Sequence, residues 1–207
     1  MSKEKDWSKM AKNFDELQDY IVGEETSFII SKELAKLHRL GNVLELGCGN
    51  GKYTRQIIHA SKNITATDFA PEMVDAAKEK LEDLENLHIE KADCYKLKYE
   101  DNSFDTVFMA NLIHVVLEPE EALAEAKRVL KKDGKLILLS FTPDGMTLEN
   151  IENMKRKYLE VFGSFPDKKV PMMLKDLVSM VEAKEMAVNK AELIGSDTKA
   201  MFVIAAH

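Results

Sequence analysis

Three glycines follow a short apolar run and could bring a ligand close to the backbone. The stretch ELGCGNGKYTRQII covers residues 45–58 and places Gly47, Gly49 and Gly51 between a predicted strand and a predicted helix. Glycine has no Cβ and tolerates positive φ, so backbone N–H groups in such a passage can contact a bound group. The helix that follows turns the positive end of its dipole toward the same place, which favours an anionic ligand group. Because structural βα turns also contain glycines, the loop alone does not identify a ligand.

Three acidic residues accompany this loop. Glu45 directly precedes it, Asp68 ends the apolar run ITATD, and Asp93 ends LHIEKAD. A carboxylate at a strand end can accept hydrogen bonds from both hydroxyls of a ribose. An isolated Asp in such a place is more often a helix cap or a solvated charge. The position of Asp68, one βα unit after the glycine loop, favours the ligand interpretation.

The elements that must position these residues alternate between short apolar runs and amphipathic stretches, which predicts successive βαβ units. Seven strands are expected, at residues 43–46, 64–68, 87–93, 104–110, 135–141, 186–194 and 199–207. The last two are separated only by a Gly-Ser-Asp turn, so they should be antiparallel. The predicted fold class is α/β, with a doubly wound, mostly parallel seven-stranded sheet and a C-terminal antiparallel hairpin. Parallel strands would bring Glu45, Asp68 and Asp93 to one edge of that sheet.

The length and composition fit one domain over residues 1–207, with 45% hydrophobic residues available for a core. We expect an N-terminal helical cap at 1–40 and a helical insertion at 142–184 over an acceptor pocket. The formal net charge of -7 disfavours broad binding of nucleic acid backbones. No apolar stretch predicts a membrane span or a signal peptide, so a cytoplasmic protein is expected. With Cys48 and Cys94 as the only cysteines, neither a disulfide framework nor a metal site is predicted.

The spacing of the glycines separates two ligand classes. A dinucleotide fingerprint, G-x-G-x-x-G, would require glycine at Lys52, whereas this loop reads G-x-G-x-G. The shorter form, preceded by Glu45, resembles motif I of class I S-adenosylmethionine (SAM)-dependent methyltransferases. The resemblance implies that the loop, Cys48 included, wraps the methionine part of SAM. It also implies that Glu45 lies near the amino group of SAM.

Two further segments resemble the same family. DFAPEMV at 68–74 is similar to its second motif, which implies that Asp68 binds the ribose and that Phe69 and Met73 pack on the adenosine. Ordinary helix–sheet core remains the alternative for both apolar residues. KADCYKL at 91–97 implies that Asp93 binds the adenine amine and that the backbone N–H of Cys94 binds the ring. A nucleophilic cysteine is a sharper alternative, but nothing nearby in sequence would lower its pKa.

The segment NLIHVV at 111–116 is expected to face the transferred methyl group. Asn111 is the candidate polar contact to SAM, and His114 is the candidate general base because an imidazole titrates near neutrality. The alternative for His114 is a hydrogen-bonded histidine at the sheet rim. Tyr20 resembles a lid tyrosine that some relatives place over SAM.

The resulting hypothesis is a SAM-dependent methyltransferase acting on a small molecule, with O, N and S acceptors all open. A non-catalytic SAM-binding protein or a methyltransferase-like partner subunit is the alternative, and only turnover separates the two. A nicotinamide oxidoreductase is disfavoured by Lys52 and by the antiparallel ending. Protein or tRNA acceptors would need a basic patch, and such charges usually form a solvated face. The candidate patch consists of Lys155, Arg156, Lys157, Lys168 and Lys169.

Overall fold

A seven-stranded sheet forms the centre of the molecule in the computed structural model, which describes residues 8–165 and 170–207. Its strands run β3-β2-β1-β4-β5-β7-β6. Adjacent strands from β3 to β5 pair in parallel, whereas β7 is antiparallel to both β5 and β6. The mostly parallel sheet with a C-terminal antiparallel hairpin is therefore confirmed. The strands are β1 (Gly41–Leu46), β2 (Ser61–Asp68), β3 (Leu87–Lys91), β4 (Phe104–Ala110), β5 (Leu130–Thr142), β6 (Ala187–Ile194) and β7 (Lys199–Ala206).

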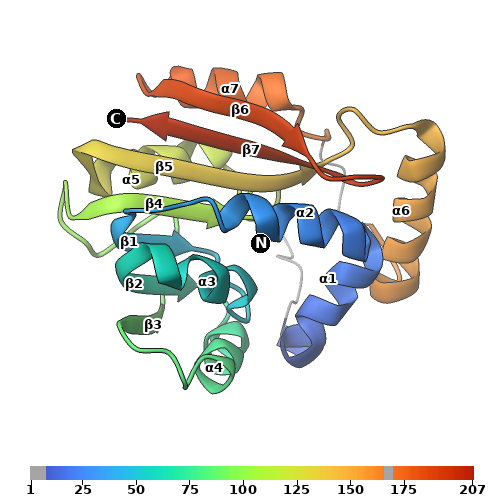
Figure 1. Cartoon of the computed structure of the whole chain (residues 1–207), viewed down its shortest axis with the longest axis horizontal. Helices are drawn as coiled ribbons and strands as arrows, with labels where there is room; N and C mark the ends of the chain where they lie inside the picture. The colour runs from blue at the N-terminus through green and yellow to red at the C-terminus, as the bar shows by residue number, and fades with distance from the viewer. Residues whose placement is uncertain (1–7, 166–169) are drawn as a thin grey trace.

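Helices cover both faces of the sheet (Figure 1). Proline occupies the first turn of two of them, where its missing N–H has no helical partner to lose. The α-helices are α1 (Phe14–Val22), α2 (Glu24–Leu34), α3 (Lys52–Ile57), α4 (Pro71–Lys80), α5 (Pro119–Val129), α6 (Leu148–Phe162) and α7 (Leu174–Glu182). Short 3-10 helices cover Ser8–Asn13 (η1) and Ile58–Ala60 (η2).

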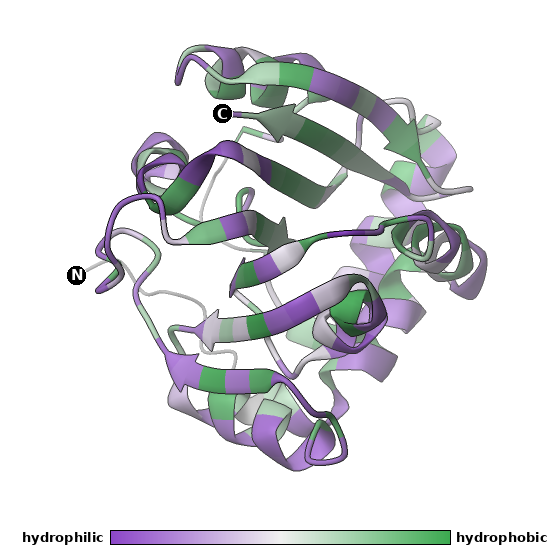
Figure 2. Cartoon of the chain, turned by 60° about the vertical axis from the view of Figure 1, so that its left-hand side comes forward, coloured by the Kyte–Doolittle hydropathy of each residue, from purple (hydrophilic) through white to green (hydrophobic). Residues whose placement is uncertain are grey.

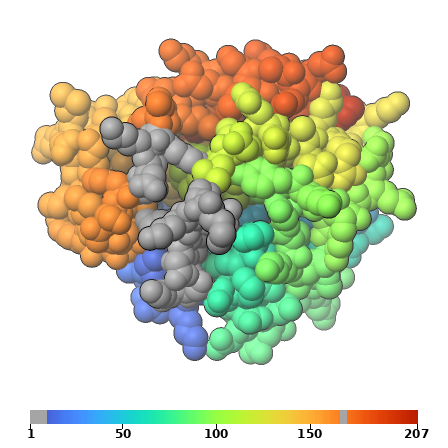
Figure 3. Space-filling view, turned by 180° about the vertical axis from the view of Figure 1, so that it is seen from behind, coloured from blue at the N-terminus to red at the C-terminus, as the bar shows by residue number. Residues whose placement is uncertain are grey.

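Alternating side chains of the strands build two cores. Along β1, Val43 packs with α2, α3 and α4, while Leu44 and Leu46 pack on the other face with α5 and α7. Figure 2 shows β7, which ends at the C-terminus, hydrophobic along most of its length, while the edge strand β6 is mixed. The face seen in Figure 3 carries α5 and α7, with α6 at its side. Open α/β sheets bind ligands at the carboxyl ends of their parallel strands, so a ligand site is expected there.

Two strand boundaries differ most from the expected ones. The third strand, expected at 87–93, ends at Lys91, two residues before Asp93. The strand expected at 135–141 begins at Leu130 and includes Asp133 and Gly134. Leu130 is fully buried opposite Phe104, so the strand starts early and absorbs the extra residues as a register shift against β4.

In the N-terminal cap, α1 lies beyond the carboxyl ends of the parallel strands beside α6, whereas α2 packs on one face of the sheet (Figure 1). Its first seven residues lie outside the described ones. Asn50 of the glycine loop donates a 3.2 Å hydrogen bond to the carbonyl of Ala11 in η1. Lys52, at the start of α3, forms a 2.5 Å ion pair with Asp19 of α1. The cap is thus fastened directly to the loop that the sequence singled out.

Candidate functional site

The glycine loop leaves β1 and enters α3 through three residues of positive φ: 72° at Gly47, 56° at Gly49 and 86° at Gly51. A Cβ added at Gly51 would lie 2.4 Å from Leu81, and one at Gly47 would lie 2.9 Å from Leu112. A Cβ added at Gly49 would meet nothing within 4 Å. The outer glycines are therefore required by packing, whereas Gly49 borders open space that a ligand could enter.

Glu45 is completely buried at the end of β1. Its Oε2 accepts a 2.6 Å hydrogen bond from the hydroxyl of Thr54 in α3, and its Oε1 is buried without a hydrogen-bond partner. Burial, opposed by the Thr54 hydrogen bond and reinforced by the nearby Asp68 carboxylate, raises the pKa of Glu45 to about 7. Oε1 of this carboxyl is thus a buried acceptor without a donor among the described residues.

Asp68 lies at the carboxyl end of β2, next to β1 in the sheet. Its Oδ2 accepts a 2.9 Å hydrogen bond from the Gly49 N–H, and its Oδ1 accepts one of the same length from the Ala70 N–H. Burial raises the pKa of Asp68, although these backbone N–H groups favour its charged form. Each oxygen retains acceptor capacity for a ligand hydroxyl.

Asp93 follows β3 in a tight turn closed by a bridge to Lys96. Its Oδ1 accepts a 2.9 Å hydrogen bond from the Tyr95 N–H. The Tyr95 hydroxyl in turn accepts hydrogen bonds from the N–H groups of Leu117 and Glu118, at 2.8 and 3.2 Å. The turn that carries Asp93 and the partly buried Cys94 is thereby linked to the start of α5, just after the segment that contains His114.

The other predicted adenosine contacts differ in exposure. Phe69 is 52% exposed, with the Lys91 ammonium 5.2 Å from its ring centroid, whereas Met73 is buried in α4. An exposed phenyl ring beside Asp68 offers a surface for a flat ligand group. The buried Met73 agrees equally well with ordinary packing.

Cys48 is buried in the glycine loop, and its N–H donates a 2.8 Å hydrogen bond to the carbonyl of Thr67. Burial and the neighbouring carboxyls of Glu45 and Asp68 raise the pKa of its thiol well above its ordinary value. This cysteine therefore holds the loop against β2 and is unsuited to act as a thiolate.

Asn111 and His114 follow β4. Asn111 has a positive φ of 55°, and its Nδ2 donates to the Tyr53 hydroxyl at 3.3 Å while its Oδ1 accepts from the Phe141 N–H at 3.2 Å. His114 Nδ1 lies 2.7 Å from the Oγ of Ser140, which is completely buried in β5. Both side chains are thus oriented by hydrogen bonds to neighbouring elements.

Tyr20 is a residue of α1 whose side chain contacts α6. Its hydroxyl donates a 2.5 Å hydrogen bond to Glu160, and the Lys157 ammonium lies 5.2 Å from its ring centroid. In this arrangement its hydroxyl contacts α6 rather than the glycine loop. Its expected role as a lid over a cofactor stays a prediction.

Sequence reasoning missed three residues that shape the site: Thr54, Tyr53 and Ser140. Tyr53 and Thr54 lie in the first turn of α3, the helix that follows the glycine loop. The spacing of nine residues from Glu45 to Thr54 could have suggested the contact, since α3 packs back on β1. No sequence pattern pointed to Ser140, because its contact with His114 depends on how β5 lies against the segment after β4.

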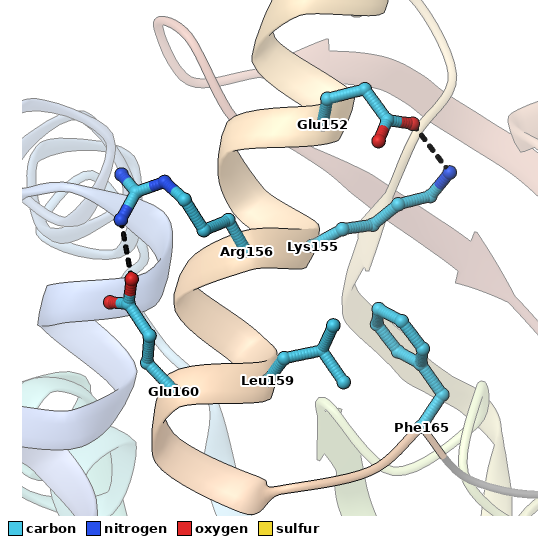
Figure 4. A pocket seen from close by; sticks show the side chains of 6 residues that line it. All are labelled: Glu152, Lys155, Arg156, Leu159, Glu160 and Phe165. Carbon is cyan, nitrogen blue, oxygen red and sulfur yellow. Dashed lines mark hydrogen bonds and ion pairs between the residues drawn. The ribbon is translucent and has the colours of Figure 1, made fainter.

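A separate hollow lies along α6. Figure 4 shows the ion pairs Glu152–Lys155 and Arg156–Glu160 around the apolar side chains of Leu159 and Phe165. The pairs lie within one helix, so the basic residues predicted as a patch are partly neutralised. Lys168 and Lys169 lie outside the described residues.

Within residues 8–165 and 170–207, no group of histidine, cysteine and carboxylate side chains could hold a metal ion. Nor is any helix in that part of the chain long and apolar enough to cross a membrane. At the glycine loop, the buried Oε1 of Glu45 has no hydrogen-bond partner among the described residues, and the carboxyl of Asp68 accepts from the Gly49 N–H.

Comparison with known proteins agrees with this geometry. Residues 44–138 match the family described as "Methyltransferase domain". The ubiquinone/menaquinone biosynthesis C-methyltransferase UbiE of Citrifermentans bemidjiense is 33% identical over 112 residues, 51% of this chain and 48% of that protein. The phosphatidylethanolamine N-methyltransferase of Cereibacter sphaeroides is 33% identical over 133 residues, 62% of this chain and 65% of that protein. The alignment with the first relative therefore spans about half of its length.

The fold has a close counterpart among solved structures. The crystal structure of a SAM-dependent methyltransferase from Aquifex aeolicus aligns with a TM-score of 0.68 and 22% identity. The match covers 96% of this chain and 97% of that one. The likeness therefore extends over the cap, the sheet and the C-terminal hairpin.

Proposed function

Because the chain belongs, through residues 44–138, to the class I methyltransferase-domain family, we propose that it binds SAM and transfers the methyl group to a small-molecule acceptor. The observation that carries the proposal is that Glu45, completely buried with an unpartnered Oε1, lies near Asp68, which accepts a hydrogen bond from the Gly49 N–H beside open space. That pair fits a ligand with an ammonium group at one end and ribose hydroxyls at the other. SAM has both.

Each residue of the site would contact a different part of the cofactor. Glu45 accepts a hydrogen bond from the ammonium group through its unpaired Oε1, and Asp68 accepts from the ribose hydroxyls. Phe69 covers the adenine face, and the turn at Asp93 and Cys94 contacts its edge. When bound, SAM supplies a methyl group on a sulfonium that a nucleophile can take by in-line displacement. Little covalent assistance is then needed, so most of the acceleration comes from orientation and exclusion of water.

On the acceptor side, His114 is the proposed general base. The 2.7 Å contact between Ser140 Oγ and Nδ1 of His114 holds the imidazole in position. A positioned base of this kind accelerates proton removal by roughly 10²–10⁴-fold. O, N and S acceptors are all compatible with this role, whereas an acceptor that is already deprotonated would not need it.

The apolar stripe of α6 supports an acceptor with apolar bulk. None of the residues of α6 is fully buried, although its helical spacing gives it an apolar face toward α1. The half-buried residues of that stripe are Ile151, Met154, Tyr158, Val161 and Phe162. One relative is named a ubiquinone/menaquinone biosynthesis C-methyltransferase and another a phosphatidylethanolamine N-methyltransferase, and an acceptor with an apolar tail would fit such a wall. α7 contributes to the core instead, through Leu177 and Val181.

Calorimetric titration tests the cofactor assignment. Purified protein should bind SAM and not NADH, and Asp68→Ala should abolish SAM binding while retaining a cooperative unfolding transition. Asp75→Ala, at an exposed position of α4, is the matched control and should bind normally. Unaltered SAM binding by Asp68→Ala would contradict the site.

Turnover separates an enzyme from a SAM-binding partner protein. Protein loaded with methyl-labelled SAM should transfer label to members of a panel of quinols, aminophospholipids, thiols and phenols. S-adenosylhomocysteine should appear in equal amount. Tight SAM binding with no transfer to any acceptor in the panel would favour the non-catalytic alternative.

A further inference from the structure

Glu45 is a buried carboxyl without a cationic partner. No salt bridge joins it to a lysine, arginine or histidine in the described ranges 8–165 and 170–207. Its single side-chain hydrogen bond comes from the uncharged Thr54 hydroxyl. An isolated carboxylate in such surroundings is costly, and a buried acid without a cation normally retains its proton.

The groups that face this carboxyl from the neighbouring elements are themselves acidic or neutral. Asp68 approaches from β2, the Cys48 thiol lies in the glycine loop, and Thr54 approaches from α3. The Asp68 carboxylate opposes a second negative charge, and the Cys48 thiol is held in its neutral form by burial. The buried Oε1 of Glu45 has no hydrogen-bond partner among the described residues, so it is the carboxyl oxygen left to accept from an entering positive group.

We infer that Glu45 holds a proton in the ligand-free protein and releases it when the ammonium group of a ligand enters, so that cofactor binding is coupled to proton release. This inference rests on the proposed function, since it assigns the ammonium of the cofactor to the unpaired Oε1. The balance is simple: the carboxyl O–H bond breaks, the proton passes to the buffer, and the carboxylate pairs with the ammonium. The positive charge of the ammonium and the negative charge of the new Glu45 carboxylate then balance each other.

The pKa of about 7 for Glu45 sets the range in which the coupling is visible. Near pH 6 the ligand-free carboxyl is mostly protonated, while a ligand ammonium is still fully charged. Binding there should release close to one proton. Near pH 8 the carboxyl is mostly ionised before the ligand arrives, so proton release should fall toward zero.

Ligand selection follows from the same arrangement. A nucleoside with an ammonium group can ionise Glu45, whereas a nucleoside without the amino acid leaves the carboxyl neutral. S-adenosylhomocysteine and 5'-methylthioadenosine form the matched pair, because both lack the sulfonium and differ in the amino acid part. Only the first should bind with proton release.

Calorimetry in buffers of different ionisation enthalpy measures the number of protons released. For S-adenosylhomocysteine we expect nearly one proton at pH 6 and little at pH 8. For 5'-methylthioadenosine and for the Glu45→Gln variant we expect none at either pH. Gln keeps the volume and the acceptor for Thr54, so folding should be preserved. Release of a proton by Glu45→Gln, or none by the unaltered protein at pH 6, would overturn the inference.

The ligand-free protein provides a second readout. Infrared spectroscopy at pH 6 should show a protonated carboxyl band that disappears on addition of S-adenosylhomocysteine and is absent in Glu45→Gln. Persistence of that band in Glu45→Gln would assign the proton to another acid and reject the inference. If neither nucleoside binds, the proposed function itself fails, whereas binding without proton release rejects only the coupling.

Discussion

The Thr54 hydroxyl donates a 2.6 Å hydrogen bond to Oε2 of Glu45, nine residues earlier in the chain. Both side chains are completely buried, and the bond joins the first turns of α3 to the end of β1 across the glycine loop. It orients the carboxyl so that Oε1 is left for another donor. A hydrogen bond that is internal to the fold thus defines the geometry of the predicted cofactor contact.

Thr54→Val should weaken both this contact and the fold. The variant keeps the volume of the side chain but leaves two carboxyl oxygens without donors, at a cost of roughly 1–3 kcal/mol in unfolding free energy. Loss of the hydrogen bond also raises the pKa of Glu45 further, so affinity for S-adenosylhomocysteine at pH 7 should fall by roughly tenfold. Urea unfolding and calorimetry measure the two effects. Thr54→Ser retains the hydroxyl and should restore most of the affinity; equal losses in both variants would argue against the hydrogen bond.

Glu45 should make the ligand-free protein less stable as pH rises. Its pKa is raised from 4.5 to about 7 on folding, so the unfolded chain loses the proton before the folded protein does. Stability is therefore lost between about pH 4.5 and 7, by roughly 3 kcal/mol at about 1.4 kcal/mol per pH unit. Glu45→Gln lacks this loss. The difference in unfolding free energy between the two proteins should shift in favour of Glu45→Gln from pH 5 to pH 8. A constant difference across that range would mean that Glu45 is ionised in the folded protein.

Gly49→Ala should mainly lose SAM affinity, whereas Gly51→Ala should mainly lose stability. Both positions have positive φ, which costs an alanine roughly 1–2 kcal/mol. At Gly51 the added methyl group also collides with Leu81, so this variant should lose more stability. At Gly49 the methyl group enters open space, so the fold should survive while SAM affinity falls by roughly tenfold or more. Thermal unfolding and calorimetry on both variants measure this contrast. Normal SAM affinity in Gly49→Ala would mean that the open space does not hold the ligand.

The fold was predictable because its signals are local. Short apolar runs separated by amphipathic stretches indicated the parallel strands, and the short turn that begins at Gly195 dictated the antiparallel hairpin. The boundary at β5 was not predictable in the same way. Leu130 continues the strand because it is buried opposite Phe104, and that pairing depends on how two distant segments are aligned.

The site was predictable only where a residue lies at the end of a strand. Glu45 and Asp68 were brought to adjacent positions by the parallel pairing of β1 and β2. The partners that orient the site come from helices and from the other strands, so their contacts had no sequence signature. The hydroxyls of Tyr53 and Ser140 are examples, since each meets a residue that follows β4.

His114 and Ser140 should act on the chemical step rather than on cofactor binding. Once an acceptor is identified, His114→Gln should lower kcat by roughly 10²-fold or more, because glutamine cannot remove a proton. Ser140→Ala leaves the imidazole in place but frees its Nδ1 side, so kcat should fall by roughly tenfold with an unchanged KM for SAM. Ser140→Thr keeps a hydroxyl and should recover part of that loss. Steady-state kinetics across pH, with Tm as the folding control, measures these effects. A kcat for His114→Gln within a few-fold of the unaltered enzyme would show that the acceptor reaches the site already deprotonated, and His114 would then be a structural residue held at the sheet rim by Ser140.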